Sequence, residues 1–266
     1  MDLELNGGTA IVTGGSKGIG KAIARELALE GVDVAIVARD TATLESTAKE
    51  LAQETGRRIL PLVADTGDDG SVRAMVGDAA AAFGHLDILV NCAAKPGGQG
   101  PVPKLADITN DLFWDDMNVK VMGYLRCARE VAPYMKEQGW GRIISVSGLA
   151  ARQSGSTIGS IRNVAVVAMT KNLADELGPH GINVTVVHPA NTRTERTPAV
   201  LEARAKASGV TLEEVEAQMA QGNSVRRFID SREIAYVVTF LASPKAGAIN
   251  GDVIAAGGGS GNAIFY

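Results

Sequence analysis

The chain has 266 residues, of which 45% are hydrophobic and 21% charged, and its formal net charge is −4. This length suits one large buried core, and we expect a single domain spanning residues 1–266. A mildly acidic chain without a basic stripe argues against a nucleic-acid partner. No apolar run has membrane-spanning length, and no charged-then-apolar leader precedes the first strand.

Two cysteines, Cys92 and Cys127, lack the spacing of metal ligands, and no other metal-binding pattern is present. We interpret them as small apolar side chains in a reducing compartment. The protein is therefore expected to be cytoplasmic and to hold no metal ion.

Short apolar segments alternate along the chain with segments of helical periodicity. Thr9–Val12 predicts the first strand, and Ile19, Ile23 and Leu27 then recur every four residues, as on one buried helix face. Further strands are predicted at Val34–Ala38, Ile59–Val63, Ile88–Val90, Arg142–Val146, Ile182–His188 and Val253–Ala255. The helices between them are expected near 44–51, 72–83, 111–137, 157–177 and 233–241.

Strands that are apolar throughout, each followed by a helix, are typical of a parallel sheet covered on both faces. The pattern predicts an α/β, doubly wound, Rossmann-like fold with about seven strands. Ligands of such folds bind beyond the carboxyl ends of the strands.

The first strand leads into Thr13-Gly14-Gly15-Ser16-Lys17-Gly18-Ile19-Gly20, and a helix follows. Gly14 permits a tight turn, Gly18 lets the backbone approach a pyrophosphate, and Gly20 allows close helix–strand packing. The free N–H groups of the helix N-terminus attract phosphate. A glycine-rich connecting loop without a ligand is the alternative, but the position between strand and helix favours dinucleotide binding.

The end of the second strand indicates which dinucleotide is bound. NAD-binding versions usually carry an acidic residue there, whereas this chain has Ala38 followed by Arg39. Arg39 suits the 2′-phosphate of NADP, and Lys17 could reach the same group. We interpret Asp40 as the N-cap of the next helix. NADP(H) is therefore the expected cofactor.

Ordered motifs along nearly the whole chain resemble the short-chain dehydrogenase/reductase family. They include the first glycine-rich turn, the helix asparagine Asn118, and Ser147 after the fifth strand. Asn91-Cys92-Ala93-Ala94 is similar to the family's Asn-Asn-Ala-Gly, and His188-Pro189-Ala190 through Thr194 is similar to its nicotinamide-side segment. Together, the turn and the resemblance imply cofactor contacts at Gly14, Ser16, Lys17, Gly18, Ile19, Gly20, Arg39, Asp65, Thr66, Asn91, Ala93, Asn163, Pro189, Thr192 and Thr194.

In that family a Tyr-x-x-x-Lys pair transfers the proton, a serine orients the carbonyl, and the helix asparagine supports a water relay. The resemblance places Asn118 in the last role. Strict pairing puts the serine position at Gly148, so Ser147, one residue before it, is the candidate for the serine's role, while Gly159 and Asn163 occupy the tyrosine and lysine positions. No tyrosine lies between Tyr134 and Tyr236, so no change of register restores the pair.

Several side chains could replace the missing acid. Arg162 could stabilise an oxyanion but not supply a proton, and His188 has a suitable intrinsic pKa although a structural role is more common there. The hydroxyls of Ser154, Ser156, Thr157 and Ser160 are more often turn or helix caps.

Three hypotheses follow. The first is an NADP(H)-dependent oxidoreductase acting on a small carbonyl, imine or alcohol with a non-standard proton donor. The second is a non-catalytic NADP(H)-binding protein, and the third is a lyase or isomerase that reuses the pocket. The family resemblance further implies a substrate lid at residues 192–228, for which a helical pair packed on the domain surface is the alternative. It also implies a homo-oligomer, tetramer or dimer, formed through helices 111–137 and 157–177. The loop 95–101 is expected to form a second pocket wall.

Overall fold

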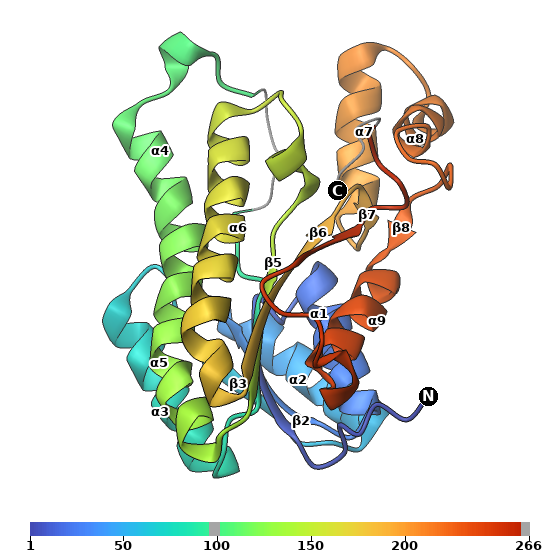
Figure 1. The fold of residues 1–266 in the computed structure, drawn as a ribbon. Coiled ribbons are helices and arrows are strands. Elements are labelled where there is room, and N and C mark those ends of the chain that lie inside the picture. Colours follow the sequence, from blue (N-terminus) through green and yellow to red (C-terminus); the bar gives the residue numbers. More distant parts are fainter. Residues whose placement is uncertain (96–101, 262–266) are drawn as a thin grey trace.

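The computed structural model describes residues 1–95 and 102–261 and contains a seven-stranded parallel sheet (Figure 1). The strand order is β3-β2-β1-β4-β5-β6-β9. The strands are β1 Thr9–Thr13, β2 Asp33–Ala38, β3 Ile59–Val63, β4 Ile88–Asn91, β5 Gly141–Val146, β6 Ile182–Pro189 and β9 Val253–Ala256. All seven predicted strands are confirmed, each with its ends within one residue of the expected positions.

Helices cover both faces of the sheet, as the apolar strands predicted (Figure 1). One face is covered by α1 Gly18–Leu29, α2 Thr41–Thr55 and α9 Ser231–Ala242. The other is covered by α3 Asp69–Phe83, α5 Gly123–Gln138 and α6 Thr157–Leu177. The fold is therefore the expected doubly wound, Rossmann-like one.

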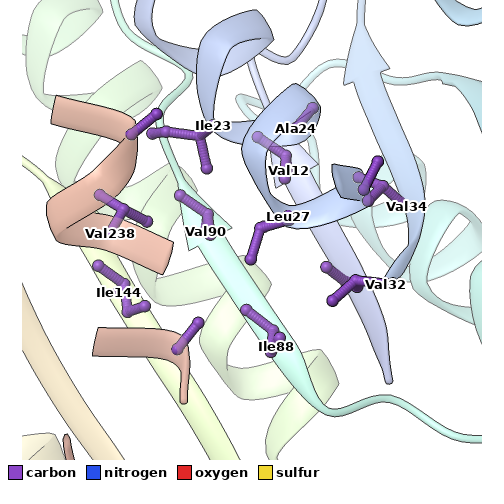
Figure 2. Close-up of a cluster of buried hydrophobic side chains, with 14 of the residues drawn as sticks. Val12, Ile23, Ala24, Leu27, Val32, Val34, Ile88, Val90, Ile144 and Val238 are labelled. Carbon is purple, nitrogen blue, oxygen red and sulfur yellow. The ribbon is translucent and has the colours of Figure 1, made fainter. Parts of the chain in front are cut away.

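Two apolar clusters hold these layers together, because successive strand residues point to opposite faces. In β1, Val12 packs with the α1 side and Ile11 with the α3 side. Figure 2 shows the first cluster, in which Ile23 and Leu27 of α1 lie over β1 and β4 beside Val238 of α9. Burial of these apolar side chains stabilises the sheet, and the functional site lies at the carboxyl edge of that sheet.

The predicted long helix from 111 to 137 contains an irregular turn. It consists of α4 Asn110–Met117, a π-helical turn at Asn118–Met122, and α5. The Gly123 N–H donates to the carbonyl of Asn118, five residues earlier, which is the π-helical pattern. Such turns are rare and frequently occur at functional sites. Nothing in the periodicity of the sequence predicted this one.

Residues 192–228 form a separate helical layer at the carboxyl edge of the sheet. It contains α7 Thr197–Ser208 and α8 Leu212–Ala220, and the two-residue strands β7 Thr192–Arg193 and β8 Ile229–Asp230 pair in parallel across its base. Leu201 and Val215 are buried between the helices, whereas Leu212 is exposed. The β7–β8 pair was not predicted.

Within the described ranges, none of the helices combines the length and apolarity needed to cross a membrane.

Candidate functional site

A cavity of about 630 Å³ opens beyond the carboxyl ends of the strands. The chain runs from β1 to neighbouring β2 on one side, while β4 lies on the other, so the strand order switches direction there. Thr13 joins the two strand ends, because its Oγ1 accepts hydrogen bonds from the N–H groups of Cys92 (3.0 Å) and Ala93 (3.2 Å). A crevice at such a switch point is where dinucleotides bind in doubly wound folds.

The glycine-rich turn forms one wall of this cavity. Gly14 and Gly18 adopt positive φ angles, +68° and +58°. A Cβ on Gly20 would lie 2.2 Å from the Gly14 carbonyl oxygen, so no larger residue fits without opening the turn. A Cβ on Gly14 would lie 3.0 Å from Cys92 O and from Ala93 N. The backbone is thus held close to the cavity, as pyrophosphate binding requires.

An acidic side chain already lies at the start of α1. The Glu195 carboxylate accepts hydrogen bonds from the Gly18 N–H, at 2.9 Å to Oε1 and 3.1 Å to Oε2. Gly18 is the first residue of α1, where unpaired N–H groups and the helix dipole favour an anion. The turn therefore binds an anionic oxygen pair in this structure, and its donors fit a dinucleotide phosphate.

Basic side chains lie next to this turn. Lys17 and Arg39 both line the cavity, and Arg39 is 3.8 Å from the Asp65 carboxylate, with 71% of its side chain exposed. Asp40 accepts from the Thr43 N–H at 2.9 Å and caps α2, which confirms its interpretation as an N-cap. Its hydrogen bonds to Thr43 lower its pKa. Asp40 is thus occupied by the helix, and Arg39 is left to face a ligand.

The structure brings most of the expected site residues to this one cavity. Those that line it are Gly14, Ser16, Lys17, Gly18, Ile19, Gly20, Arg39, Asp65, Thr66, Ala93, Ser147, Pro189 and Thr194. Thr192 instead lines a neighbouring cavity of about 390 Å³ under α7. Asn91, Asn118, Gly159 and Asn163 are not among the lining residues.

Asn91 and Asn118 lie beneath the cavity wall. Asn91 is 1% exposed, and neither amide atom of its side chain has a hydrogen-bond partner among the described residues. Asn118 donates from Nδ2 to Gly67 O (3.2 Å) and accepts at Oδ1 from Arg126 (2.9 Å). The side chain of Asn118 therefore fixes the π turn against the loop after β3, and its expected part in a water relay stays a prediction.

Ser147 and Asn163 belong to one buried hydrogen-bond network with Lys120, a residue of the π turn. Asn163 Oδ1 accepts from Ser147 Oγ at 3.0 Å and from Lys120 Nζ at 3.0 Å. Asn163 Nδ2 donates to Gly159 O at 2.8 Å, which fixes the amide orientation. Lys120 also donates to Ser147 O at 3.1 Å, is 4% exposed, and lines the cavity.

Lys120 was not among the predicted site residues, although the sequence contains a signal for it. Tyr124, Cys127, Val131 and Met135 form the buried stripe of α5, with spacings of three or four residues. Extending that stripe backwards by four residues reaches Lys120. A lysine on an apolar stripe is an uncommon placement that marks a candidate functional residue.

The other candidate acids have partners of their own. Arg162 lines the cavity and forms a 2.5 Å ion pair with Asp116. His188 is fully buried, with Nδ1 3.2 Å from Gly148 N, and burial lowers its pKa. Ser156 caps α6 by accepting from the Gly159 N–H, and Ser160 donates to Gln153 O. The capping interpretation is confirmed for Ser156, whereas Ser160 ties α6 to the preceding loop.

Two further expectations concern metals and the second pocket wall. Among the described residues, no group of three or more His, Cys, Asp or Glu side chains is arranged to hold a metal ion. The proposed wall at 95–101 lies, except for Lys95, outside the described residues.

Comparison with known proteins identifies the family. The family model described as "Enoyl-(Acyl carrier protein) reductase" matches residues 14–260. The short-chain reductase protein NovJ of Streptomyces niveus is 33% identical over 252 residues, covering 94% of this chain and 92% of that protein. The NADPH-dependent reductase BacG of Bacillus subtilis is 31% identical over 259 residues, covering 95% and 97%.

A solved structure agrees with these sequence matches. The L-sorbose reductase of Gluconobacter frateurii, complexed with NADPH and L-sorbose, superposes with a TM-score of 0.92 at 28% identity, and the match covers 98% of each chain. The strand order, the glycine-rich turn at the switch point and these full-length similarities lead to one conclusion. The chain belongs to the short-chain dehydrogenase/reductase family of oxidoreductases and has the doubly wound, Rossmann-like fold of its structural relatives.

Proposed function

We propose that this protein is an NADPH-dependent oxidoreductase that reduces a small carbonyl or imine, or oxidises the corresponding alcohol or amine. The observation that carries the proposal is the single cavity in which a phosphate-binding turn and Ser147 lie together. A hydroxyl beside a dinucleotide cradle is the arrangement needed to orient a polar C=O or C=N group.

The preference for NADPH rests on charge. Lys17 and Arg39 line the cavity next to the turn, while Asp40 is engaged in capping α2. An arginine fork recognises a 2′-phosphate, which NADH lacks. Two of the similar proteins support this preference: the Bacillus reductase is NADPH-dependent, and the Gluconobacter sorbose reductase was solved in complex with NADPH.

The residues that would hold the dinucleotide are those of the turn and of the loops after β2, β3, β4 and β6. When bound, NADPH supplies a hydride. The chain must supply the rest: orientation by Ser147, exclusion of water, and a proton for the developing oxygen or nitrogen. Gly159 and Asn163 cannot act as the family's acid pair, so the proton comes from a non-standard donor.

The absence of that pair also favours a second candidate, a non-catalytic NADP(H)-binding protein. Glycine at 159 carries no acid at all, and general acid catalysis is worth about 10²–10⁴ in rate. The third candidate, a lyase or isomerase, would show turnover without change in nicotinamide absorbance.

One experiment separates the three. The wild-type protein is titrated with NADPH by fluorescence and then assayed for NADPH consumption with ethyl acetoacetate, cyclohexanone, L-sorbose and 2-methyl-1-pyrroline. We expect binding and consumption with at least one carbonyl or imine. Binding without consumption, and without any change in the added compounds, would support the non-catalytic candidate. Failure to bind at millimolar NADPH would refute both nucleotide-dependent candidates.

We further propose that a second copy of the chain packs on α4, α5 and α6. These helices and the π turn between α4 and α5 expose large apolar side chains: Leu112, Trp114, Met122, Tyr134, Ile161 and Val164. An apolar surface of this kind is typical of a subunit interface. Sedimentation at micromolar concentration tests the proposal, and a monomeric mass would refute it.

The proposal has two further parts, a lid over the site and a location in the cell. We propose that residues 192–228 act as a substrate lid, since α7 and α8 enclose the second cavity and Thr194, Glu195 and Arg196 line the first. We also propose a cytoplasmic location, supported by the unpaired state of Cys92 and Cys127. Limited proteolysis within 192–228 should be slowed by NADPH if this segment closes over it.

A further inference from the structure

We propose that Lys120 is the proton donor of this enzyme. Its ammonium group, which extends from the π turn between α4 and α5, takes the place of the tyrosine and lysine that the family uses. The proposal rests on the NADPH-dependent reduction proposed above and names the group that protonates its product. Four observations on the described residues support it: position, hydrogen bonding, charge and the identity of residue 163.

The first observation is the position of Lys120. Its side chain is 4% exposed, yet it lines the same cavity as the glycine-rich turn and Ser147. The π turn at Asn118–Met122 begins two residues before it. The lysine therefore reaches the cavity from the helix that precedes β5, whereas the family's lysine position, Asn163, lies on the helix after β5.

The second observation is the number of hydrogen bonds that the Lys120 ammonium group donates. An ammonium group has three protons to donate. Lys120 Nζ donates to Ser147 O at 3.1 Å and to Asn163 Oδ1 at 3.0 Å, and no third acceptor for it is found among the described residues. The neutral amine keeps both hydrogen bonds. The third proton can thus leave and return without rearranging the network, which is what a proton donor requires.

The charge environment is the third. No carboxylate of the described residues forms an ion pair with Lys120; both acceptors are neutral carbonyl oxygens. Burial lowers the pKa of Lys120 to about 7, and the positive charge of Arg162 acts in the same direction. Asp116 opposes that lowering, but it is paired with Arg162. A general acid works best when its pKa lies near the working pH.

Titratable and charged groups face Lys120 from every element packed around it. They are Cys92 after β4, Asp116 of α4, Tyr124 of α5, Arg162 of α6 and His188 of β6. Burial raises the pKa of the Cys92 thiol to about 12, and burial also raises that of Tyr124. Arginine stays protonated at ordinary pH. Lys120 is therefore the group of this set best able to release a proton into the cavity at neutral pH.

Asparagine at 163 is the fourth observation. Its Oδ1 accepts from Lys120 and its Nδ2 donates to Gly159 O. A lysine at 163 would bring a second ammonium group to within hydrogen-bond distance of the first, and the two charges would repel. Compared with the family arrangement, Lys120 and Asn163 together still leave one amine at the site. That amine extends from the π turn, whereas the family's lysine position lies on α6.

Proton transfer from Lys120 completes the reduction of a carbonyl. As hydride reaches the carbonyl carbon, the C=O π electrons move to oxygen, and the third proton of the Lys120 ammonium transfers to that oxygen. The products are the alcohol, the oxidised cofactor and a neutral Lys120 amine, which regains a proton from water. For reduction the donor must be protonated, so kcat/KM should be level below about pH 7 and fall tenfold per unit above it. For oxidation the same group must be neutral, and the limb reverses.

The first test needs neither cofactor nor substrate. Folded wild-type protein is acylated briefly by trace acetic anhydride at pH 5 to 11, and each lysine is quantified by peptide mass spectrometry. We expect Lys120 to become reactive with a midpoint near pH 7, with exposed Lys136 on α5 as the internal control. Titration of Lys120 together with Lys136, or no labelling of Lys120 at any pH, would overturn the proposal.

The second test moves the pKa. Asn163→Asp keeps an acceptor oxygen beside Lys120 and adds a negative charge about 3 Å away, which stabilises the ammonium form. An opposite charge at this distance shifts a pKa by about 1–3 units. Both the labelling midpoint and the descending limb of kcat/KM should therefore move upwards by that amount. A structural lysine would leave the pH limb where it is in the wild type, and that result would overturn the proposal.

The third test removes the amine. Lys120→Met should lower kcat about 10²–10⁴-fold and abolish the limb, while NADPH affinity stays within about threefold. Lys136→Met is the matched control and should change neither. If Lys120→Met turns over at the wild-type rate, the proposed role of Lys120 is refuted, whereas the proposed function of the protein is not affected. Absence of NADPH binding or of any reduction in the wild type refutes the proposed function, and with it the donor role, whatever the labelling shows.

Discussion

Removing one carboxylate should tighten cofactor binding. The Glu195 side chain accepts two contacts from the Gly18 N–H, at the point of α1 where a dinucleotide phosphate would bind. NADPH must displace it, so its interaction with the helix N-terminus opposes binding. Glu195→Gln removes the negative charge and retains the shape and length of the side chain.

The size of the effect follows from exposure. Glu195 is solvent-exposed, and a charge at an exposed helix N-terminus contributes about 0.3–1 kcal/mol. Since 1.4 kcal/mol corresponds to tenfold in affinity, NADPH should bind about two- to fivefold more tightly to Glu195→Gln. The gain should shrink at high salt, because salt screens exposed charges.

The assay is a fluorescence titration with NADPH at low and high salt. Glu202→Gln is the matched control: it removes one exposed carboxylate from α7, and the Glu202 side chain makes no contact with the turn. We expect its affinity to equal that of the wild type. Weaker NADPH binding to Glu195→Gln would mean that the carboxylate supports the bound cofactor, and equal gains in both variants would mean that net charge alone is responsible.

Three other substitutions test the fold and the cofactor preference. Arg39→Ala should weaken NADPH binding about tenfold and leave NADH unchanged, near the lower end of a charge-assisted bond because this side chain is 71% exposed; equal losses for both nucleotides would contradict the assignment. Gly20→Ala places a Cβ 2.2 Å from Gly14 O, so we expect a loss of stability of about 1–3 kcal/mol by urea unfolding and no detectable NADPH binding. Tyr124→Phe removes a buried hydroxyl that donates to Val146 O at 2.8 Å and should cost about 1–2 kcal/mol in the same unfolding assay; an unchanged midpoint would show that the carbonyl finds another donor.

Features written in contiguous residues could be predicted from the sequence. Each strand is an apolar run, and each run lies in the sheet because its residues can be buried on both faces. The glycine-rich turn follows directly from β1, since only glycine fits at Gly14 and Gly20. The capping of α2 by Asp40 is equally local, as the carboxylate bonds a residue three positions away.

Features that depend on several distant segments could not be predicted. Asn91 and Asn163 were expected to contact the cofactor; both amides are buried and neither residue lines the cavity, so these contacts stay predictions. The hydrogen bonds of Asn118 to Gly67 and Arg126 also cross elements. Side-chain direction at these positions is set by packing between layers, and the sequence carries no local trace of it.

The sequence by itself determined the order of the strands along the chain, the phosphate-binding turn and the loss of the tyrosine–lysine pair, because each is a property of neighbouring residues. Only the tertiary structure shows which side chains surround the position of that pair. The network of Lys120, Ser147 and Asn163 joins residues 16 to 43 positions apart. The π-helical turn and the packing of α6 against β6 bring them within hydrogen-bond distance of one another, and long-range contacts of that kind are fixed by the packed core.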